Sequence, residues 1–273
     1  MVRDFFRARE GIDGWTREDT ELRARQTLAM PTRMRRDFDE WLEPVSRAQI
    51  FLDVGCGLGG LISAAASRGI KGAGIDNRLA VLVIAKRLIE RHGGEAVLAC
   101  ANAESLPLAN ESAGAVVMHD VIEHVADLES ALAEASRVTV IGGVFACSTP
   151  NRFSIAPEPH VHLLGVGWLP RKYQAGYVRR RIGWDYRGTS LRSSRELLEI
   201  IERVTAFDAR AFVAPIPEGE ITTARGMRKM LARGYNVVIR NSLAGKILLW
   251  LGPFFHVTGT RRRKSPDVGN QAG

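Results

Sequence analysis

Short apolar runs alternate with segments of helical periodicity between residues 50 and 150. Each run has the length of a buried strand, and the segments between them place apolar residues at the spacing of one helix face. Strands that alternate with helices in this way form a parallel sheet with helices on both faces. The expected strands are 50–54, 72–75, 95–100, 113–118 and 144–148, and the expected helices are 58–68, 79–91 and 128–140. The pattern therefore predicts an α/β fold with a Rossmann-like sheet.

The alternation stops after Pro150. Residues 151–192 contain prolines, aromatic residues and arginines without a period, and a long irregular stretch inside a compact domain is usually functional or mobile. Ser193 and Glu196 then form a capping-box pattern at the start of another helix. Further elements are expected as a strand over 207–215, helices within 218–251 and a last strand over 254–260. The sheet is therefore expected to have seven strands, mostly parallel.

Three regions follow from this organisation of the 273-residue chain. Residues 1–48 are expected to form an N-terminal helical cap. The main domain is expected to occupy residues 49–262, with a lid inserted after the fifth strand at about 151–192. Residues 263–273 are expected to be a flexible tail.

The composition excludes disordered and membrane-spanning classes. Apolar residues make up 45% of the chain and charged residues 25%, as in globular proteins. The longest apolar run is about half the ~18 residues that a membrane span needs, and the N-terminus lacks the apolar stretch of a secretory signal. The three cysteines, Cys56, Cys100 and Cys147, are too far apart for a zinc motif or a disulfide framework. We therefore expect a cytoplasmic protein.

A glycine-rich segment, Leu52-Asp-Val-Gly-Cys-Gly-Leu-Gly-Gly60, joins the first expected strand to the next helix. Glycines let the backbone approach a ligand closely, and the helix N-terminus offers free N–H groups. Asp76, at the end of the second strand, suits the hydroxyls of a ribose. The segment therefore predicts a nucleoside-like cofactor. Because Gly55, Gly57 and Gly60 also satisfy the G-x-G-x-x-G pattern, an NAD(P)-dependent oxidoreductase remains an alternative.

Three further segments extend the pattern beyond the glycines. They are Gly74-Ile-Asp76, Ala101-Asn-Ala-Glu-Ser-Leu-Pro-Leu108 and Met118-His-Asp-Val-Ile-Glu-His-Val125. With the glycine segment, and in this order, they resemble the class I S-adenosylmethionine (SAM)-dependent methyltransferases of the type 11 group. The resemblance covers about residues 50–150 and includes Asp53 and Glu123-His124, which dehydrogenases do not share.

The resemblance implies a set of cofactor-binding residues. The glycines would back the methionine moiety, Asp76 would hold the ribose hydroxyls, and Asn102 with Ala103 would edge the adenine. Many relatives have Asp in place of Asn102, but an amide oxygen can also accept a hydrogen bond from the adenine. Asp53 would orient the loop or the methionine amine. The expected set is Asp53, Gly55, Cys56, Gly57, Gly59, Asp76, Asn77, Asn102, Ala103 and His119.

Methyl transfer from a sulfonium is an in-line displacement, so positioning supplies much of the catalysis. No Asn/Asp-Pro-Pro-Tyr and no Pro-Cys follows the fourth strand, which argues against methylation of adenine amino groups and cytosine C5. We therefore expect O-methylation, with an imidazole or carboxylate as base. The candidate catalytic residues are His119, Asp120, His124, His160 and His162.

A metal-assisted reaction is a further hypothesis. Asp120, Glu123 and His124 would share one face if they formed a helical turn, and this face could hold Mg²⁺ or another divalent ion. The same stretch resembles the ubiquinone-biosynthesis O-methyltransferases, and that resemblance implies a divalent ion at the acidic positions. In metal-free relatives these side chains organise the loop or cap the helix.

The acceptor is expected to be a small molecule or a glycan with a hydroxyl, such as a sugar or secondary metabolite. Aromatic residues of 151–192 suit sugar or planar rings, and the arginines suit anionic groups. Nucleic acid is not expected, because no RNA-binding module is recognisable. Residues 244–255 are expected to be a core helix, with peripheral membrane contact and a polyprenylated, lipid-linked acceptor as the alternative. A non-catalytic cofactor-binding module also remains open, and the sequence does not give the oligomeric state.

Overall fold

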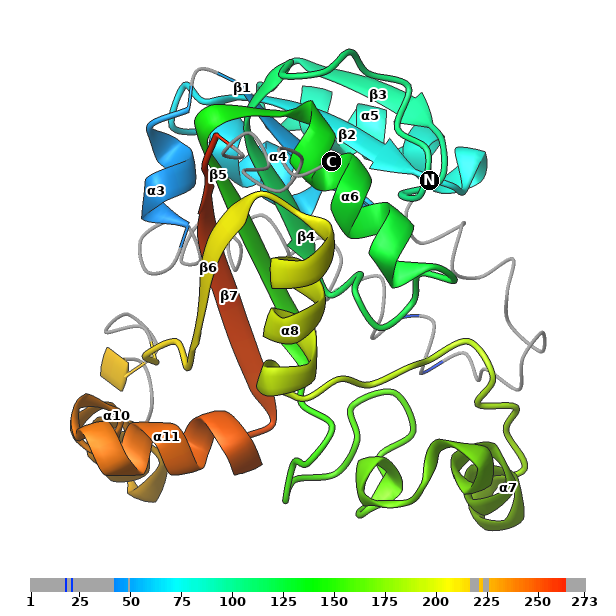
Figure 1. Ribbon diagram of the computed structural model, residues 1–273, viewed down its shortest axis with the longest axis vertical. Helices are drawn as coiled ribbons and strands as arrows, with labels where there is room; N and C mark the ends of the chain where they lie inside the picture. The colour runs from blue at the N-terminus through cyan, green and yellow to red at the C-terminus, as the bar shows by residue number, and fades with distance from the viewer. Residues whose placement is uncertain are drawn as a thin grey trace, which may run out of the picture.

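The computed structural model describes residues 42–48, 50–216, 221–222 and 226–263, together with Glu18 and Glu21. These residues form a seven-stranded sheet with the strand order β3-β2-β1-β4-β5-β7-β6 (Figure 1). The first five strands run parallel, and β7 pairs antiparallel with both β5 and β6. The strands are β1 (Ile50–Val54), β2 (Lys71–Asp76), β3 (Ala96–Cys100), β4 (Ala113–His119), β5 (Thr139–Pro150), β6 (Phe207–Phe212) and β7 (Phe254–Arg261). The predicted seven-stranded, mostly parallel sheet is confirmed.

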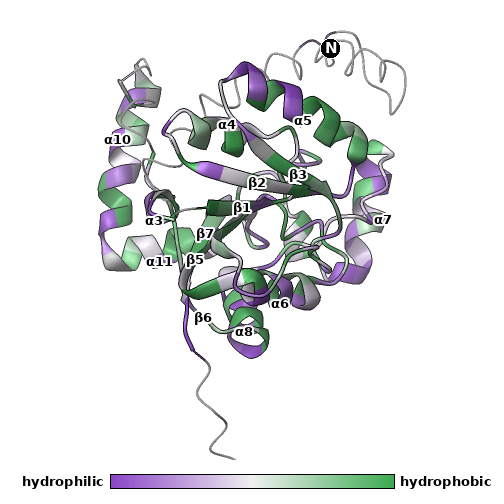
Figure 2. Ribbon diagram, turned by 90° about the horizontal axis from the view of Figure 1, so that it is seen from above, coloured by the Kyte–Doolittle hydropathy of each residue, from purple (hydrophilic) through white to green (hydrophobic). Residues whose placement is uncertain are grey.

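Helices cover both faces of this sheet (Figure 2). They are α3 (Glu43–Ser46), α4 (Gly60–Ala66), α5 (Leu79–Arg91), α6 (Leu128–Val138), α7 (Arg171–Ile182), α8 (Ser194–Val204), α10 (Met227–Arg240) and α11 (Ser242–Leu251), with a 3₁₀ turn at Val166–Trp168. Alternate residues of β4 point to opposite faces, as in any strand. Val116 and Met118 join the core beneath α6 and α8, whereas Ala115 and Val117 join the core beneath α3, α4 and α5.

Local capping explains where two of these helices begin. The Asp127 carboxylate accepts hydrogen bonds from the backbone N–H groups of Glu129 and Ser130 at the start of α6. At the start of α8, Ser193 and Glu196 form the reciprocal bonds of a capping box. Each arrangement satisfies N–H groups that the first helical turn leaves unpaired. The capping box predicted from the sequence is confirmed.

Two predicted helix boundaries are wrong. The helix expected over 128–140 ends at Val138, because the β-branched residues from Thr139 onward begin β5 and pair with Ala113 of β4. The helix expected to begin at residue 58 begins at Gly60, because Gly59 has a left-handed backbone with a φ of 73°.

Some predicted regions fall on residues that the structure does not describe. Most of the N-terminal cap expected over 1–48 and nearly all of the tail expected over 263–273 lie outside the described residues. The boundaries of the main domain therefore stay predictions.

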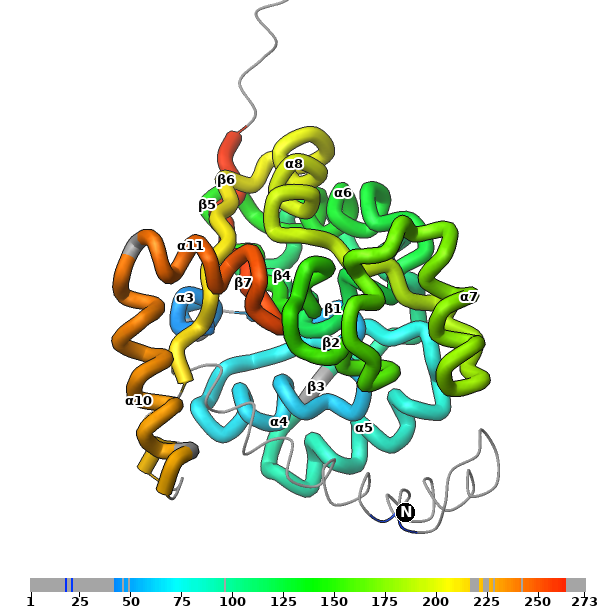
Figure 3. Tube along the Cα trace, turned by 90° about the horizontal axis from the view of Figure 1, so that it is seen from below, coloured from blue at the N-terminus to red at the C-terminus, as the bar shows by residue number. Residues whose placement is uncertain are grey.

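The segment after β5 crosses the end of the sheet where the parallel strands finish. Its residues 151–192 include α7 and have a small core of their own, made by Val161, Val166, Val178 and Tyr186. Seen from that end, α7 lies on one side of the sheet and the α10–α11 hairpin on the other (Figure 3). None of the helices in the described part of the chain combines the length and hydropathy needed to span a bilayer.

Candidate active site

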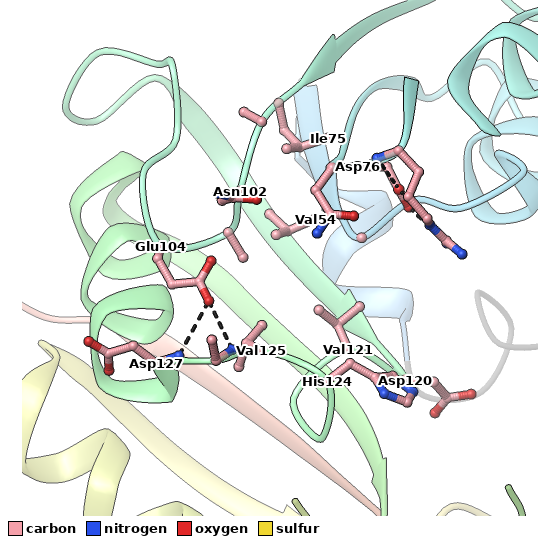
Figure 4. A pocket seen from close by; sticks show the side chains of 16 residues that line it. Val54, Ile75, Asp76, Asn102, Glu104, Asp120, Val121, His124, Val125 and Asp127 are labelled. Atoms are coloured by element: carbon pink, nitrogen blue, oxygen red, sulfur yellow. Dashed lines mark hydrogen bonds and ion pairs between the residues drawn. The ribbon is translucent and has the colours of Figure 1, made fainter. Parts of the chain in front are cut away.

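A cavity of about 770 Å³ opens at the carboxyl ends of β1, β2, β3 and β4. In open α/β sheets, ligands bind where the strand order reverses, which in this sheet is between β1 and β4. Figure 4 shows the side chains that line the cavity. The lining residues are 54–55, 75–78, 101–104, 120–121 and 124–127.

The glycine loop forms one wall of the cavity, and its residues Gly55 and Gly57 have a left-handed backbone. A Cβ atom on Gly55 would lie 2.3 Å from Cγ2 of Val121, and the φ of Gly55 is 75°. Gly57 also has a left-handed backbone, but the nearest atom to a Cβ there is 4.0 Å away. Gly55 is thus required by packing, whereas Gly57 leaves open space above the loop.

Asp76 connects this loop to the end of β2. Its Oδ2 accepts a hydrogen bond from the backbone N–H of Gly57 at 3.0 Å. Its Oδ1 accepts from the backbone N–H of Arg78 at 2.9 Å and from Arg78 Nε at 3.2 Å. Asp76 is buried and also lines the cavity, so the same carboxylate fixes the loop and faces the space where a ligand binds.

Beneath the loop, Asp53 is 3% exposed. Burial raises the pKa of Asp53 to about 7, although the nearby His119 acts to lower it. Cys56 is also buried under the loop, and a Cβ on Gly74 would lie 2.8 Å from its sulfur. Both side chains support the loop from the core side.

Glu123, His124 and His160 form a cluster next to the cavity, and His124 is the member that lines the cavity wall. Glu123 and His124 follow β4, and His160 belongs to the segment after β5. His124 Nε2 lies 3.1 Å from His160 Nε2, and the two rings are nearly perpendicular. Glu123 Oε1 lies 3.9 Å from His124 Nε2 and 4.0 Å from His160 Nε2. Three donor atoms therefore converge at one point.

Glu123 is held in this position by a neighbouring strand. Its side chain is 1% exposed, and its Oε2 accepts a hydrogen bond from Thr149 Oγ1 at 2.9 Å. Its Oε1 has no hydrogen-bond partner among the described residues. Burial raises the pKa of Glu123 to about 7. An unpaired buried oxygen of this kind is costly unless a ligand satisfies it.

The two imidazoles have opposite tendencies to hold a proton. The Nδ1 of His160 is hydrogen-bonded to Glu158 Oε1, and this bond raises the pKa of His160. Burial, and next the charge of His160, lower the pKa of His124. Because the pKa of His124 lies below its usual 6.5, its ring is neutral at pH 7, and its Nε2 accepts a hydrogen bond from His160 whenever Nε2 of His160 carries a proton.

Comparison with known proteins shows which family this part of the chain resembles. Residues 52–147 match a protein-family model described as a methyltransferase domain. The chain carries a methyltransferase domain. The ubiquinone biosynthesis O-methyltransferase of Methylobacterium sp. (strain 4-46) is 34% identical over 124 residues, which cover 44% of this chain and 49% of that protein. This chain thus spans about half the length of the curated relatives it matches.

Solved methyltransferase structures share the fold of most of this chain. A SAM-dependent methyltransferase from Archaeoglobus fulgidus has a TM-score of 0.55 at 15% identity and covers 94% of this chain and 99% of its own. Phosphoethanolamine N-methyltransferase 2 of Haemonchus contortus, solved with phosphomonomethylethanolamine and S-adenosylhomocysteine, has a TM-score of 0.52 at 17% identity, over 82% of this chain and 53% of its own. At these identities the likeness concerns the fold alone.

The resemblance based on four sequence segments is confirmed by the family match over residues 52–147. The nicotinamide alternative for the glycine loop is therefore not supported. Five of the predicted cofactor residues line the cavity, namely Gly55, Asp76, Asn77, Asn102 and Ala103. The other five, Asp53, Cys56, Gly57, Gly59 and His119, do not belong to the lining.

The sequence did not identify two cavity residues of the methyltransferase domain. Arg78 holds the Asp76 carboxylate, and its position two residues after Asp76 was a signal for this contact. The Glu104 carboxylate accepts hydrogen bonds from the backbone N–H groups of Ala126 and Asp127, at 3.0 and 3.3 Å. Only the tertiary fold brings those two segments together.

The interpretation of 120–124 as one helical turn is wrong. Asp120 has a left-handed backbone with a φ of 55°, and the following residues form turns until α6 begins. Its carboxylate accepts a hydrogen bond from Ser148 Oγ at 2.8 Å and lies 3.4 Å from His119 Nδ1. The Asp120 carboxylate is therefore hydrogen-bonded to β5. His160, and not Asp120 as expected, is the third residue of the cluster with Glu123 and His124.

The other predicted acceptor residues are dispersed. His162 has a left-handed backbone and lies outside the Glu123–His124–His160 cluster. Tyr186 is buried in the core of the segment after β5, and Arg171 pairs with Glu196. Trp168, Tyr173 and Trp184 are exposed and do not line the cavity.

The donor atoms of the cluster fit a divalent ion, as the unpaired Glu123 Oε1 indicates. Two imidazole nitrogens and one carboxylate are ligands typical of Zn²⁺, Mn²⁺ or Fe²⁺, whereas Mg²⁺ prefers oxygen ligands. The set that the structure brings together thus favours a transition metal over the Mg²⁺ expected from the sequence.

Proposed function

We propose that this protein transfers a methyl group from SAM to a hydroxyl of a small-molecule acceptor. The observation that carries this proposal is the position of His124. Its side chain belongs both to the wall of the cavity and to the Glu123–His124–His160 cluster. A base at the edge of a cofactor cavity is where a hydroxyl acceptor has to lose its proton.

The cavity residues support cofactor binding in a defined orientation. Asp76 has its carboxylate in the wall at the end of β2, where it suits the ribose hydroxyls, and Asn102 with Ala103 lies at the end of β3. His124 and Asp120 lie away from Asn102 along the cavity wall (Figure 4). We place the adenine near Asn102 and the sulfonium end toward His124. Bound SAM supplies an electrophilic methyl group.

Proton removal is assigned to His124. Its neutral Nε2 accepts the hydroxyl proton as the acceptor oxygen attacks the methyl carbon. The bond from that carbon to the sulfonium sulfur breaks at the same time, its electron pair stays on sulfur, and S-adenosylhomocysteine leaves. Glu123 Oε1, at 3.9 Å from Nε2, then stabilises the imidazolium. The two rings, in contact at 3.1 Å, would have to separate for the hydroxyl to reach Nε2 of His124, and His160, oriented by Glu158, would then donate a hydrogen bond to the acceptor oxygen.

Ion binding is a second role for the same cluster, favoured by the unpaired Glu123 Oε1. Glu123, His124 and His160 would hold the ion. A bound divalent ion lowers the pKa of a hydroxyl, so it would supply the activation otherwise assigned to His124.

The acceptor class follows from the cluster and from the relatives. An imidazole base suits a hydroxyl, which supports O-methylation of a metabolite or glycan. The relatives named ubiquinone biosynthesis O-methyltransferases favour a lipid-linked, polyprenylated acceptor as the second candidate.

Transfer of labelled methyl from SAM into fractionated extract tests the proposal. Polar metabolites and glycans, lipids, and nucleic acids are separated after incubation with the wild-type protein or with His124→Ala. We expect label in the metabolite and glycan fraction, and loss of this label in the variant. Label in the lipid fraction supports the second candidate, and no label in any fraction, despite SAM binding, contradicts the proposed activity.

A further inference from the structure

Helices α10 and α11 pack against each other at the edge of the protein (Figure 1), and both expose apolar side chains. Met230 of α10 is 62% exposed, and Leu243 and Trp250 of α11 are 68% and 56% exposed. The exposed apolar residues recur at helical spacing along both helices. They are Met227, Met230, Leu231, Val237 and Val238 on α10, and Leu243, Ile247 and Trp250 on α11. We call this surface the hairpin face.

The opposite side of α10 is attached to the protein by polar groups. Asn236 bonds both the backbone N–H and the carbonyl of Ile216, each at 2.7 Å. The hydroxyl of Tyr235 donates to the carbonyl of Ala214 at 3.3 Å. A surface helix of a globular protein normally turns its apolar stripe inward and its polar residues outward. The hairpin exposes apolar residues on its outward side, while Leu249 of α11 packs against the main core. The expectation that residues 244–255 form a core helix therefore holds only for the inward side of α11.

The charge of the hairpin is entirely positive. Residues 227–251 contain five basic residues and no Asp or Glu: Arg228, Lys229, Arg233, Arg240 and Lys246. The side chains of Arg233, Arg240 and Lys246 are exposed alongside the hairpin face. Apolar side chains, a tryptophan and a surplus of Lys and Arg on short helices are the signature of helices that lie in the interface of an anionic membrane.

The hairpin face continues onto the segment that carries His160. The backbone N–H of Ile155 donates to the carbonyl of Leu251 at 3.1 Å, and Asn151 Nδ2 donates to the carbonyl of Trp250 at 2.9 Å. The rings of Trp168 and Trp250 lie 6.3 Å apart. Ile155 and Trp168 are exposed. The end of α11 is thus fastened to the segment after β5, next to the proposed acceptor site.

We propose that the hairpin face docks on the surface of an anionic lipid membrane. The apolar stripe would enter the headgroup region, and the surrounding cations would pair with lipid phosphates. Neither helix is long enough to cross a bilayer, which fits contact along the surface. The proposal does not depend on the methyl acceptor. It places the segment after β5 at the lipid surface.

Vesicle sedimentation of the full chain tests this docking. The protein is mixed with vesicles of phosphatidylcholine alone, or of equal parts phosphatidylcholine and phosphatidylglycerol. We expect binding to the anionic vesicles, and weaker binding in high salt. The variant Ile247→Glu should bind at least about tenfold more weakly, because it puts a charge where an exposed apolar side chain would enter the lipid headgroup region. The matched control is Val83→Glu, on the exposed side of α5, which should bind like the wild type.

A second variant keeps the test independent of folding. Arg233→Gln combined with Lys246→Gln changes only exposed side chains, and it should weaken binding to the anionic vesicles by about tenfold. Equal binding by the wild type and both hairpin variants would overturn the proposal, as would absence of binding to anionic vesicles. So would light scattering that shows a dimer which Ile247→Glu dissociates, since a second copy would then cover the face.

Discussion

The Nε2 atoms of His124 and His160 face each other at 3.1 Å, although the two residues are 36 positions apart in the sequence. One ring follows β4 and the other belongs to the segment after β5. Their opposite pKa tendencies give one neutral acceptor and one proton-holding donor. The proposed acceptor site is therefore formed by two segments, and the charge of His160 helps to lower the pKa of His124.

Replacing Asp76 should remove most of the affinity for the cofactor. Asp76→Ala removes a buried carboxylate that lines the cavity and also leaves the N–H of Gly57 without its partner. We expect the Kd of S-adenosylhomocysteine, measured by calorimetry, to rise by about tenfold or more, since a hydrogen bond to a charged group contributes about 1.5–3 kcal/mol. Asp185→Ala, an exposed carboxylate in the segment after β5, is the control. Unchanged affinity in Asp76→Ala contradicts the assignment of the ribose site.

The pH dependence of kcat/KM distinguishes the two imidazoles. Burial and the charge of His160 lower the pKa of His124 below 6.5, so a His124 base is active at neutral pH and loses activity only below that value. In His160→Gln the charge of His160 is absent, so the acidic limb should move upward, toward pH 6.5. A pH titration of both proteins measures this shift. If the acidic limb of the wild-type kcat/KM profile lies above pH 6.5, the base is instead His160, because Glu158 raises the pKa of His160.

Glu123 makes stability depend on pH. Its folded-state pKa is about 7 against an ordinary 4.5, so its contribution to stability is complete below pH 4.5 and is lost as the pH rises through 7. Glu123→Gln, which keeps a partner for Thr149, should flatten this decline and raise stability at alkaline pH by on the order of 2 kcal/mol. Urea unfolding as a function of pH measures the difference. Burial also raises the pKa of Asp53 to about 7, so part of the decline in stability with pH should remain in this variant. A slope identical to that of the wild type would contradict the buried state of Glu123.

Removal of divalent ions by a chelator distinguishes two roles of the Glu123–His124–His160 cluster, namely proton removal by His124 and activation of the hydroxyl by a bound ion. If His124 removes the proton by itself, dialysis against a chelator should leave the rate of methyl transfer within about twofold, because no ion takes part in that step. Metal analysis of the purified protein is the companion measurement. If chelation abolishes activity and Zn²⁺ or Mn²⁺ restores it, a bound ion rather than His124 activates the acceptor hydroxyl.

The first five strands could be predicted from the sequence because their signal is local. Each is a short apolar run that ends at a glycine or a polar residue, and Asp76 falls at the end of β2 as expected. The boundary at Thr139 was missed because a β-branched run followed a helical pattern without a break. The backbone of Asp120 could not be predicted, since no residue pattern signals a left-handed aspartate.

The acceptor end of the site depends on tertiary structure. His160 was a candidate, but its contact with His124 arises only when the segment after β5 folds back over β4. Glu158, which orients His160, is two residues away in the sequence and was a local signal for that role. The periodicity of α11 showed an apolar stripe, but periodicity does not tell which side of a helix faces the solvent.

The most direct test of the account compares methyl transfer and cofactor binding in His124→Ala, with His92→Ala as control. His92 is an exposed histidine at the end of α5. We predict that His124→Ala binds S-adenosylhomocysteine as the wild type does but transfers methyl about 10² to 10⁴ times more slowly, the usual contribution of a general base. His92→Ala should match the wild type in both measurements. Transfer at the wild-type rate by His124→Ala would contradict the central claim that His124 prepares the acceptor.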